Sequence, residues 1–171
     1  MKAIFDPTAH TEIGSVNTLS SKASYQSDPL TLFKKLCGNK SNNLLLESAE
    51  IDKKHQLKSL LLVDAALKIV CHGNQVSFTP LSVNGEAALS FAKQQLAQYA
   101  TLTLEGKSLQ ATFAETAQTL DEKSRLLATN PFQSLRIFKQ LNNETHHPFA
   151  AFLGGAFAFD MITMSEKLPQ V

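Results

Sequence analysis

The segment Leu44–Asp52, which reads LLLESAEID, ends a run of three leucines with a carboxylate and a hydroxyl, Glu47 and Ser48. A second segment, Leu57–Asp64 (LKSLLLVD), opens its own apolar run with Lys58. Short apolar runs bounded by polar residues are typical of buried strands, so we predict two strands here. Polar ends on two such strands can bring Glu47, Ser48 and Lys58 around one small pocket. An acceptor, a donor-acceptor and a cation together suit a zwitterion such as a free amino acid.

Further strands are predicted from alternation and turn residues. The leucines of the first strand are continuous, so we expect both of its faces to be covered. A turn at residues 72–75 predicts that the strands on either side of it pair as a hairpin. Glycines interrupt the last two strands, which is typical of a bulge or a close backbone approach. The predicted strands cover residues 43–48, 57–63, 66–71, 76–79, 102–113 and 149–160.

Three helices are predicted from capping residues and from apolar spacing of three and four. Asp28, followed by a proline, is a cap for the first helix, and Gly38 is its natural end. Asn84 is expected to cap the second helix, and Asn130, again before a proline, starts the third. Residues 121–126 are polar and are predicted to form a loop or short turn. Strands in a meander with inserted helices predict an α+β fold, with about three helices packed on a mainly antiparallel sheet.

The composition excludes several classes of protein. The chain has 171 residues, 43% of them hydrophobic and 18% charged, which is typical of a globular domain. The net charge is +1 with the two signs well mixed, so we expect no nucleic-acid partner. No apolar run approaches the roughly 20 residues of a membrane helix, and the start lacks a secretory signal. Cys37 and Cys71 have neither metal-ligand spacing nor enough partners for a disulfide framework, so we predict reduced thiols and a cytoplasmic location.

Several motifs of this chain occur together in one known family. They are Asp28-Pro29, Leu32-Phe33, Leu36-Cys37-Gly38, Leu44–Asp52, Leu57–Asp64, Asn84-Gly85-Glu86-Ala87, Leu120-Asp121-Glu122, Arg125-Leu126 and Gly154–Asp160. Together they resemble the amino-terminal region of anthranilate synthase component I, a chorismate-utilising enzyme. One departure is Phe159, which stands where the family usually has tyrosine.

The resemblance predicts how the chain is organised. It runs over residues 25–171, which are expected to form the tryptophan-regulatory amino-terminal region. Residues 1–24 match poorly and are predicted to be a variable lead-in. The carboxy-terminal chorismate-binding domain of the family is expected to lie outside this sequence. Residues 161–171 end without a closing cap, and we interpret the chain as the front portion of a longer protein.

The resemblance also implies a function. The complete protein would convert chorismate and ammonia to anthranilate and pyruvate, with Mg²⁺, in tryptophan biosynthesis. A glutamine amidotransferase subunit, component II, would supply the ammonia. L-tryptophan would bind at Glu47, Ser48 and Lys58 as a feedback inhibitor. The catalytic residues and the magnesium site belong to the missing part, so none is assigned here and this segment alone is expected to be inactive.

Other interpretations stay open at this point. Without the resemblance, the three site residues would be an ordinary strand end and a solvated lysine. The chain is also compatible with a fragment of aminodeoxychorismate synthase component I, with a stand-alone amino-acid-binding module that has no catalysis, or with a structural truncation without ligand. Asp121-Glu122 resembles an acid/base pair, but a surface role or an ion pair with Arg125 is favoured. His146-His147 is predicted to lie in a solvated loop.

Overall fold

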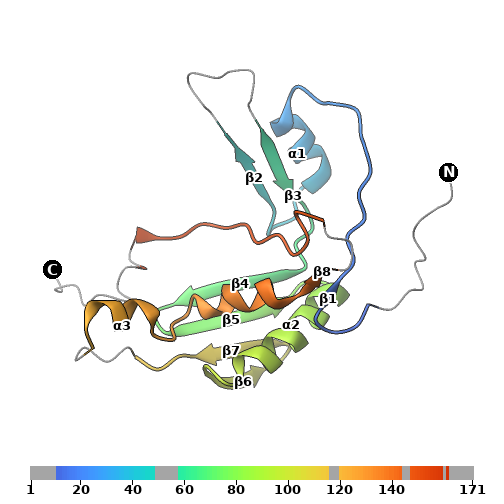
Figure 1. Cartoon of the computed structure of the whole chain (residues 1–171). Coiled ribbons are helices and arrows are strands. Elements are labelled where there is room, and N and C mark those ends of the chain that lie inside the picture. The colour runs from blue at the N-terminus through green and yellow to red at the C-terminus, as the bar shows by residue number, and fades with distance from the viewer. Residues whose placement is uncertain (1–10, 49–57, 116–119, 144–146, 160, 162–171) are drawn as a thin grey trace.

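The computed structural model describes residues 11–48, 58–115, 120–143, 147–159 and 161 (Figure 1). Its main element is a four-stranded antiparallel sheet in the order β4-β5-β7-β6, accompanied by a separate hairpin of β2 and β3 and a short parallel pair of β1 and β8. The strands are β1 (Ser15–Val16), β2 (Leu44–Glu47), β3 (Ser59–Leu62), β4 (Leu67–His72), β5 (Gln75–Pro80), β6 (Thr101–Glu105), β7 (Ser108–Thr112) and β8 (Asn142–Asn143). The helices are α1 (Pro29–Cys37), α2 (Val83–Leu96), α3 (Glu122–Leu127), α4 (Gln133–Arg136) and the 3-10 helix η2 (Ile137–Gln140).

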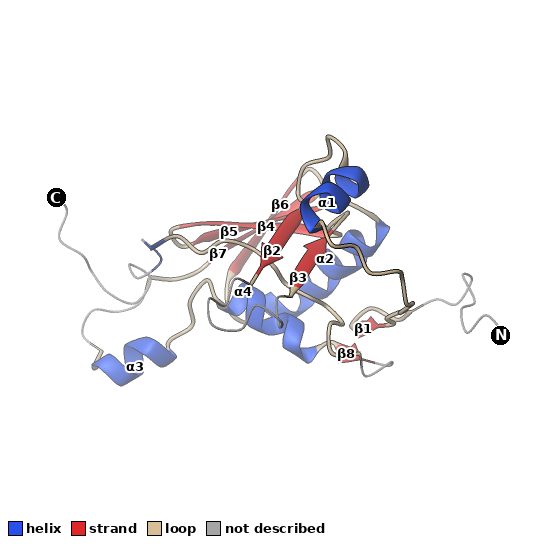
Figure 2. Ribbon diagram, turned by 90° about the horizontal axis from the view of Figure 1, so that it is seen from above, coloured by secondary structure: helices blue, strands red, loops and turns tan. Residues whose placement is uncertain are grey.

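One face of the main sheet carries the core. Side chains alternate between the faces of a strand, and the apolar ones of β5 and β7 point toward α2 and η2. Figure 2 shows α2 and α4 on the same side of the sheet. The opposite face carries hydroxyl and amide groups, including the Thr79 and Ser108 hydroxyls, which lie 3.1 Å apart. The buried core consists of Val76, Phe78, Phe91, Ala92, Leu96, Leu109, Ala111, Phe113, Ile137 and Phe138.

These elements confirm the predicted α+β fold with mainly antiparallel pairing. The first helix starts as predicted, because the Asp28 carboxylate accepts a hydrogen bond from the Thr31 amide at 2.9 Å. That bond is the main reason why the pKa of Asp28 lies below its usual value. The helix ends at Gly38, whose φ of 55° suits glycine. None of the described helices is both long and apolar enough to cross a membrane.

Two predicted strands are wrong in the structure. The last one, over 149–160, is not a strand: residues 152–158 belong to no helix or strand and pair with no described strand, and residue 160 lies outside the described residues. The single strand predicted over 102–113 is a hairpin of β6 and β7, because Gly106 turns the chain with a φ of 60°. The first strand is also less covered than expected, since β2 pairs with β3 and with no other described strand, and Leu46 is 44% exposed.

The cap of the second predicted helix and the structure of residues 121–126 differ from the prediction. α2 begins at Val83, and its cap is Ser82, whose hydroxyl accepts from the Gly85 amide, not Asn84. Residues 121–126 are predicted as a loop or short turn, but the structure has the helix α3 over Glu122–Leu127, with Asp121 as its cap. In addition, the predicted lead-in contains the short strand β1, which pairs with β8 near the far end of the described chain.

Candidate functional site

The hairpin of β2 and β3 brings the two predicted strand ends together. Leu44 lies opposite Leu62 at the base, and Glu47 lies opposite Ser59 at the other end. The pairing continues for one more residue, because the Ser48 amide donates to the Lys58 carbonyl at 3.0 Å. The predicted neighbours in space are therefore found at one end of one hairpin, the end that points away from the main sheet (Figure 1).

The side chains at this end have different partners. The Ser48 hydroxyl accepts from the Lys58 amide at 3.0 Å and donates to the Lys58 carbonyl at 3.3 Å. The Glu47 carboxylate instead accepts from the Ser59 hydroxyl at 3.4 Å. Glu47, Ser48 and Lys58 are all exposed. The described residues gather the three groups without enclosing a pocket, and the pocket itself stays a prediction.

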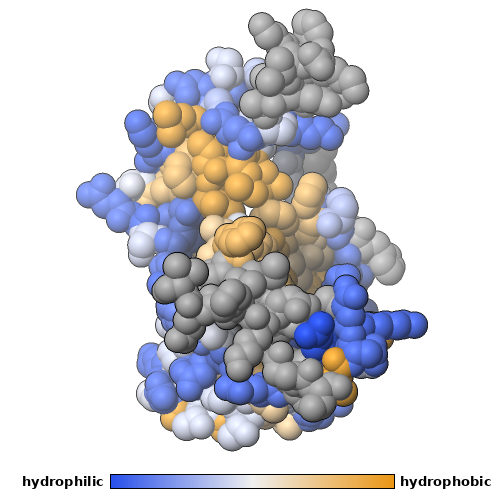
Figure 3. Space-filling model, turned by 90° about the vertical axis from the view of Figure 1, so that its left-hand side faces the viewer, coloured by the Kyte–Doolittle hydropathy of each residue, from blue (hydrophilic) through white to orange (hydrophobic). Residues whose placement is uncertain are grey.

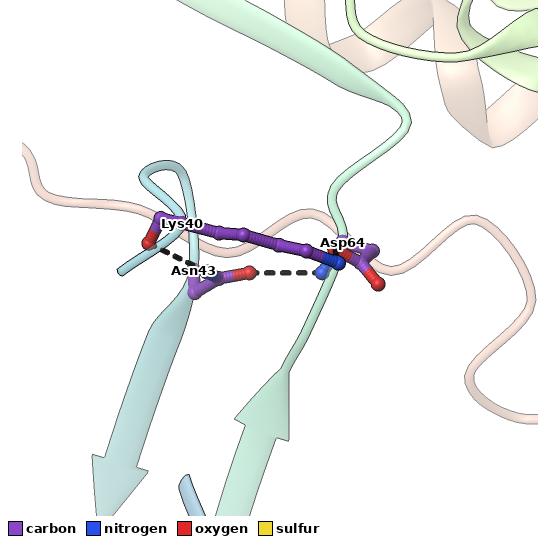
Figure 4. A network of polar contacts seen from close by, with 3 residues as sticks. All are labelled: Lys40, Asn43 and Asp64. Atoms are coloured by element: carbon purple, nitrogen blue, oxygen red, sulfur yellow. Dashed lines mark hydrogen bonds and ion pairs between the residues drawn. The ribbon is translucent and has the colours of Figure 1, made fainter. Parts of the chain in front are cut away.

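At the opposite end, the base of the hairpin is fastened by three polar residues, which we name the clasp: Lys40, Asn43 and Asp64 (Figure 4). The Asn43 side chain accepts from the Asp64 amide at 2.8 Å and donates to the Lys40 carbonyl at 3.0 Å. The Lys40 ammonium donates to the Asp64 carboxylate at 2.8 Å, and this hydrogen bond raises the pKa of Lys40. The clasp thus joins the chain after α1 to both strands of the hairpin.

The clasp leads to a prediction about stability. Asn43→Ala removes both amide bonds and is expected to lower the free energy of unfolding by about 1 kcal/mol, measured by urea denaturation. Lys40→Met removes only the ion pair, whose side chains are both 62% exposed, and its effect should be smaller. A larger loss in Lys40→Met than in Asn43→Ala would contradict this order.

A cavity of about 890 Å³ lies between the hairpin base, β4, the helices α4 and η2, and residues 151–158. Its lining is mainly apolar, with Leu44 and Leu62 from the hairpin and Ile69 from β4. Figure 3 shows apolar side chains gathered around a hollow on one side of the molecule. Glu47, Ser48 and Lys58 do not line this cavity, because they lie at the other end of the hairpin.

The remaining polar candidates have structural roles. The Asp121 carboxylate caps α3, accepting from the Ser124 amide at 3.0 Å and from its hydroxyl at 2.6 Å. These bonds lower the pKa of Asp121 and identify the group as the cap of α3. Among the described residues, no three His, Cys, Asp or Glu side chains gather to hold a metal ion. His146 lies outside the described residues, and the ring of His147 accepts from the Phe149 amide.

Comparisons with known proteins point to one enzyme. No protein-family model matches the chain. Curated relatives named anthranilate synthase component 1 do match it. The relative from Vibrio cholerae serotype O1 is 46% identical over 154 residues, which is 90% of this chain and 29% of the relative. That from Vibrio parahaemolyticus is 40% identical over 92% of this chain and 29% of its own length, and that from Escherichia coli K12 is 36% identical over 94% and 31%. The chain therefore spans about three tenths of the length of the relatives that it matches. It is homologous to part of proteins named anthranilate synthase component 1, and this coverage is consistent with an amino-terminal portion.

Proposed function

We propose that this chain is the regulatory front portion of an anthranilate synthase component 1. The observation that carries the proposal is the 46% identity over 90% of the chain to a relative of that name. In the complete protein, chorismate and ammonia would yield anthranilate, pyruvate and water. The other curated relatives considered above carry the same name, which favours this enzyme over aminodeoxychorismate synthase.

In this proposal the distal end of the hairpin is half of an L-tryptophan site. The Glu47 carboxylate accepts from the ligand's ammonium group, and the Lys58 ammonium meets the ligand's carboxylate. Charge-assisted hydrogen bonds of this kind contribute about 1.5–3 kcal/mol each. Ser48 holds Lys58 in register through its two bonds to the Lys58 backbone. Since the described residues do not enclose the ligand, the rest of the complete protein would supply the other wall, and the isolated chain would bind tryptophan weakly.

The same proposal assigns the other components. "Component 1" in the name of the relatives implies a second component, and a glutamine amidotransferase would deliver the ammonia. The resemblance implies Mg²⁺ in the complete protein, and in this proposal residues outside the present sequence would hold it. In this proposal the reaction takes place in the cytoplasm.

The proposal is tested by exchanging segments. The part of the Vibrio cholerae relative that matches this chain is replaced by the present sequence, and anthranilate is followed by its fluorescence with chorismate and an ammonium salt. We expect the chimaera to form anthranilate and to be inhibited by L-tryptophan, and the 171-residue chain alone to form none. A chimaera that folds but makes no anthranilate, or anthranilate made by the chain alone, would refute the assignment.

A further inference from the structure

Strand β4 leaves one edge of the main sheet open. It pairs with β5 on one side and with no described strand on the other. A two-residue turn joins β4 to β5, so His72 and Gln75 exchange both of their backbone hydrogen bonds, and bonded pairs alternate from there. The N–H and C=O groups of Ile69 and Cys71 therefore point away from β5. Unpaired groups along a sheet edge are a template for a further strand.

Residues 152–158, which we name the strap, have the properties of such a strand. The strap belongs to no helix or strand and follows an elongated course in Figure 1, and no backbone hydrogen bond joins it to a described helix or strand. It contains no proline, so each of its amides can donate to a ladder. Four of its seven residues are glycine or alanine, which allow a neighbouring backbone to approach closely.

The strap also lies in the right place and runs in the right direction. It lines the same 890 Å³ cavity as β4. Near its start, Gly154 abuts Leu44 of the hairpin: a Cβ there would lie 2.9 Å from the Leu44 side chain. Near its end, the Phe157 ring stacks on Phe132, with centroids 6.3 Å apart. In Figure 1 the strap runs along the open side of β4, in the same direction.

We propose that the strap closes onto β4 as a parallel strand and that the arrangement in Figure 1 is its open position. Closure pairs the outward-facing backbone groups of Ile69 and Cys71 with backbone groups of the strap. It also shields apolar side chains, since Phe157 is 64% and Leu153 46% exposed in the open position. The cavity is filled in the closed state, and the main sheet gains a fifth strand.

Closure would also connect the hairpin to the main sheet. Few contacts join the two sheets in the open position, whereas Gly154 already touches Leu44 at the hairpin base. A strap bound to β4 holds this contact at a fixed place relative to the sheet. The proposal stands independently of any ligand at the distal end of the hairpin.

The test measures single-amide hydrogen exchange by NMR on the full chain. The amides of Ile69 and Cys71 report on the open edge of β4. Ala156→Pro removes a donor from the strap and excludes it from a ladder, and Ala156→Ser is the matched control that keeps the donor. We expect both reporter amides to exchange at least about tenfold more slowly in the wild type and in Ala156→Ser than in Ala156→Pro.

Equal exchange in the wild type and in Ala156→Pro would overturn the proposal: if both are fast the edge is open, and if both are slow something else covers it. Slowing that increases with protein concentration would mean that a second copy covers the edge, which also overturns it. Protection of the Val76 and Phe78 amides, at the centre of the sheet, shows whether the variant is folded. If the amides of Val76 and Phe78 lose protection too, the variant is unfolded and the test is made on the wild type. Nuclear Overhauser effects between α-protons of the strap and the Ile69 or Cys71 amide are then expected, and their absence would refute the closure of the strap onto β4.

Discussion

Replacing Gly85 with alanine is expected to lower the free energy of unfolding by about 3 kcal/mol or more, the upper range of overpacking effects. Gly85 is buried in the first turn of α2. A Cβ at this position would lie 1.9 Å from the Ala66 carbonyl oxygen and 3.2 Å from the Pro80 Cα. Both neighbours are backbone atoms. The same Ala66 oxygen accepts from the Leu81 amide at 2.8 Å, so moving it would break that hydrogen bond. The start of α2 must lift away from the sheet instead.

Thermal and urea unfolding followed by circular dichroism measure this effect. The matched control is Gly155→Ala, because no atom lies within 4 Å of a Cβ built on Gly155 and the substitution should change stability little. Ser82→Ala, which removes only the cap of α2, should have an intermediate effect of about 1 kcal/mol. If Gly85→Ala unfolds at the same temperature and urea concentration as the wild type, then α2 does not pack on the Ala66 backbone as described.

The features that the sequence predicts well are those determined by neighbouring residues. The Asp28 cap depends on an amide three residues away, and the turn between β4 and β5 depends on Gly73, whose φ is 53°. The strands β2 and β3 are predicted because each is a short apolar run with polar ends, whereas their antiparallel pairing is seen in the structure. Serine and asparagine both cap helices, and the apolar spacing does not fix the first residue of α2, so the sequence does not decide between Ser82 and Asn84 as its cap.

The features that the sequence does not predict depend on distant parts of the chain. Residues 152–158 have the composition of a strand, yet pairing requires a partner edge, and local pattern cannot show whether that edge is engaged. The need for glycine at position 85 arises from the Ala66 carbonyl, nineteen positions away, and no local signal reveals it. At the candidate site, the spacing in the sequence predicts that Glu47, Ser48 and Lys58 lie near one another. The hydrogen-bond partners of Glu47 and Ser48 depend on the register of the two strands, which the structure provides.

In the chimaera described above, Ser48→Phe is expected to raise the L-tryptophan concentration for half inhibition by about 10–100-fold, the range of common allosteric couplings. Phenylalanine cannot make the two bonds that Ser48 makes to the Lys58 backbone, and its ring occupies space beside the ligand. Because the catalytic groups are proposed to lie outside this chain, turnover without tryptophan should stay near that of the unsubstituted chimaera. Ser48→Ala, which loses the bonds but adds no bulk, should have a smaller effect in the same direction.

Ser41→Ala serves as the matched control, since Ser41 is exposed and lies before the base of the hairpin, away from the site. Its inhibition curve should coincide with that of the unsubstituted chimaera. Full tryptophan sensitivity in Ser48→Phe would remove the regulatory role from this end of the hairpin while leaving the enzyme assignment intact. A loss of turnover together with inhibition would mean that Ser48 supports the fold of the active enzyme, because an effector site alone changes the response to tryptophan and not the uninhibited rate.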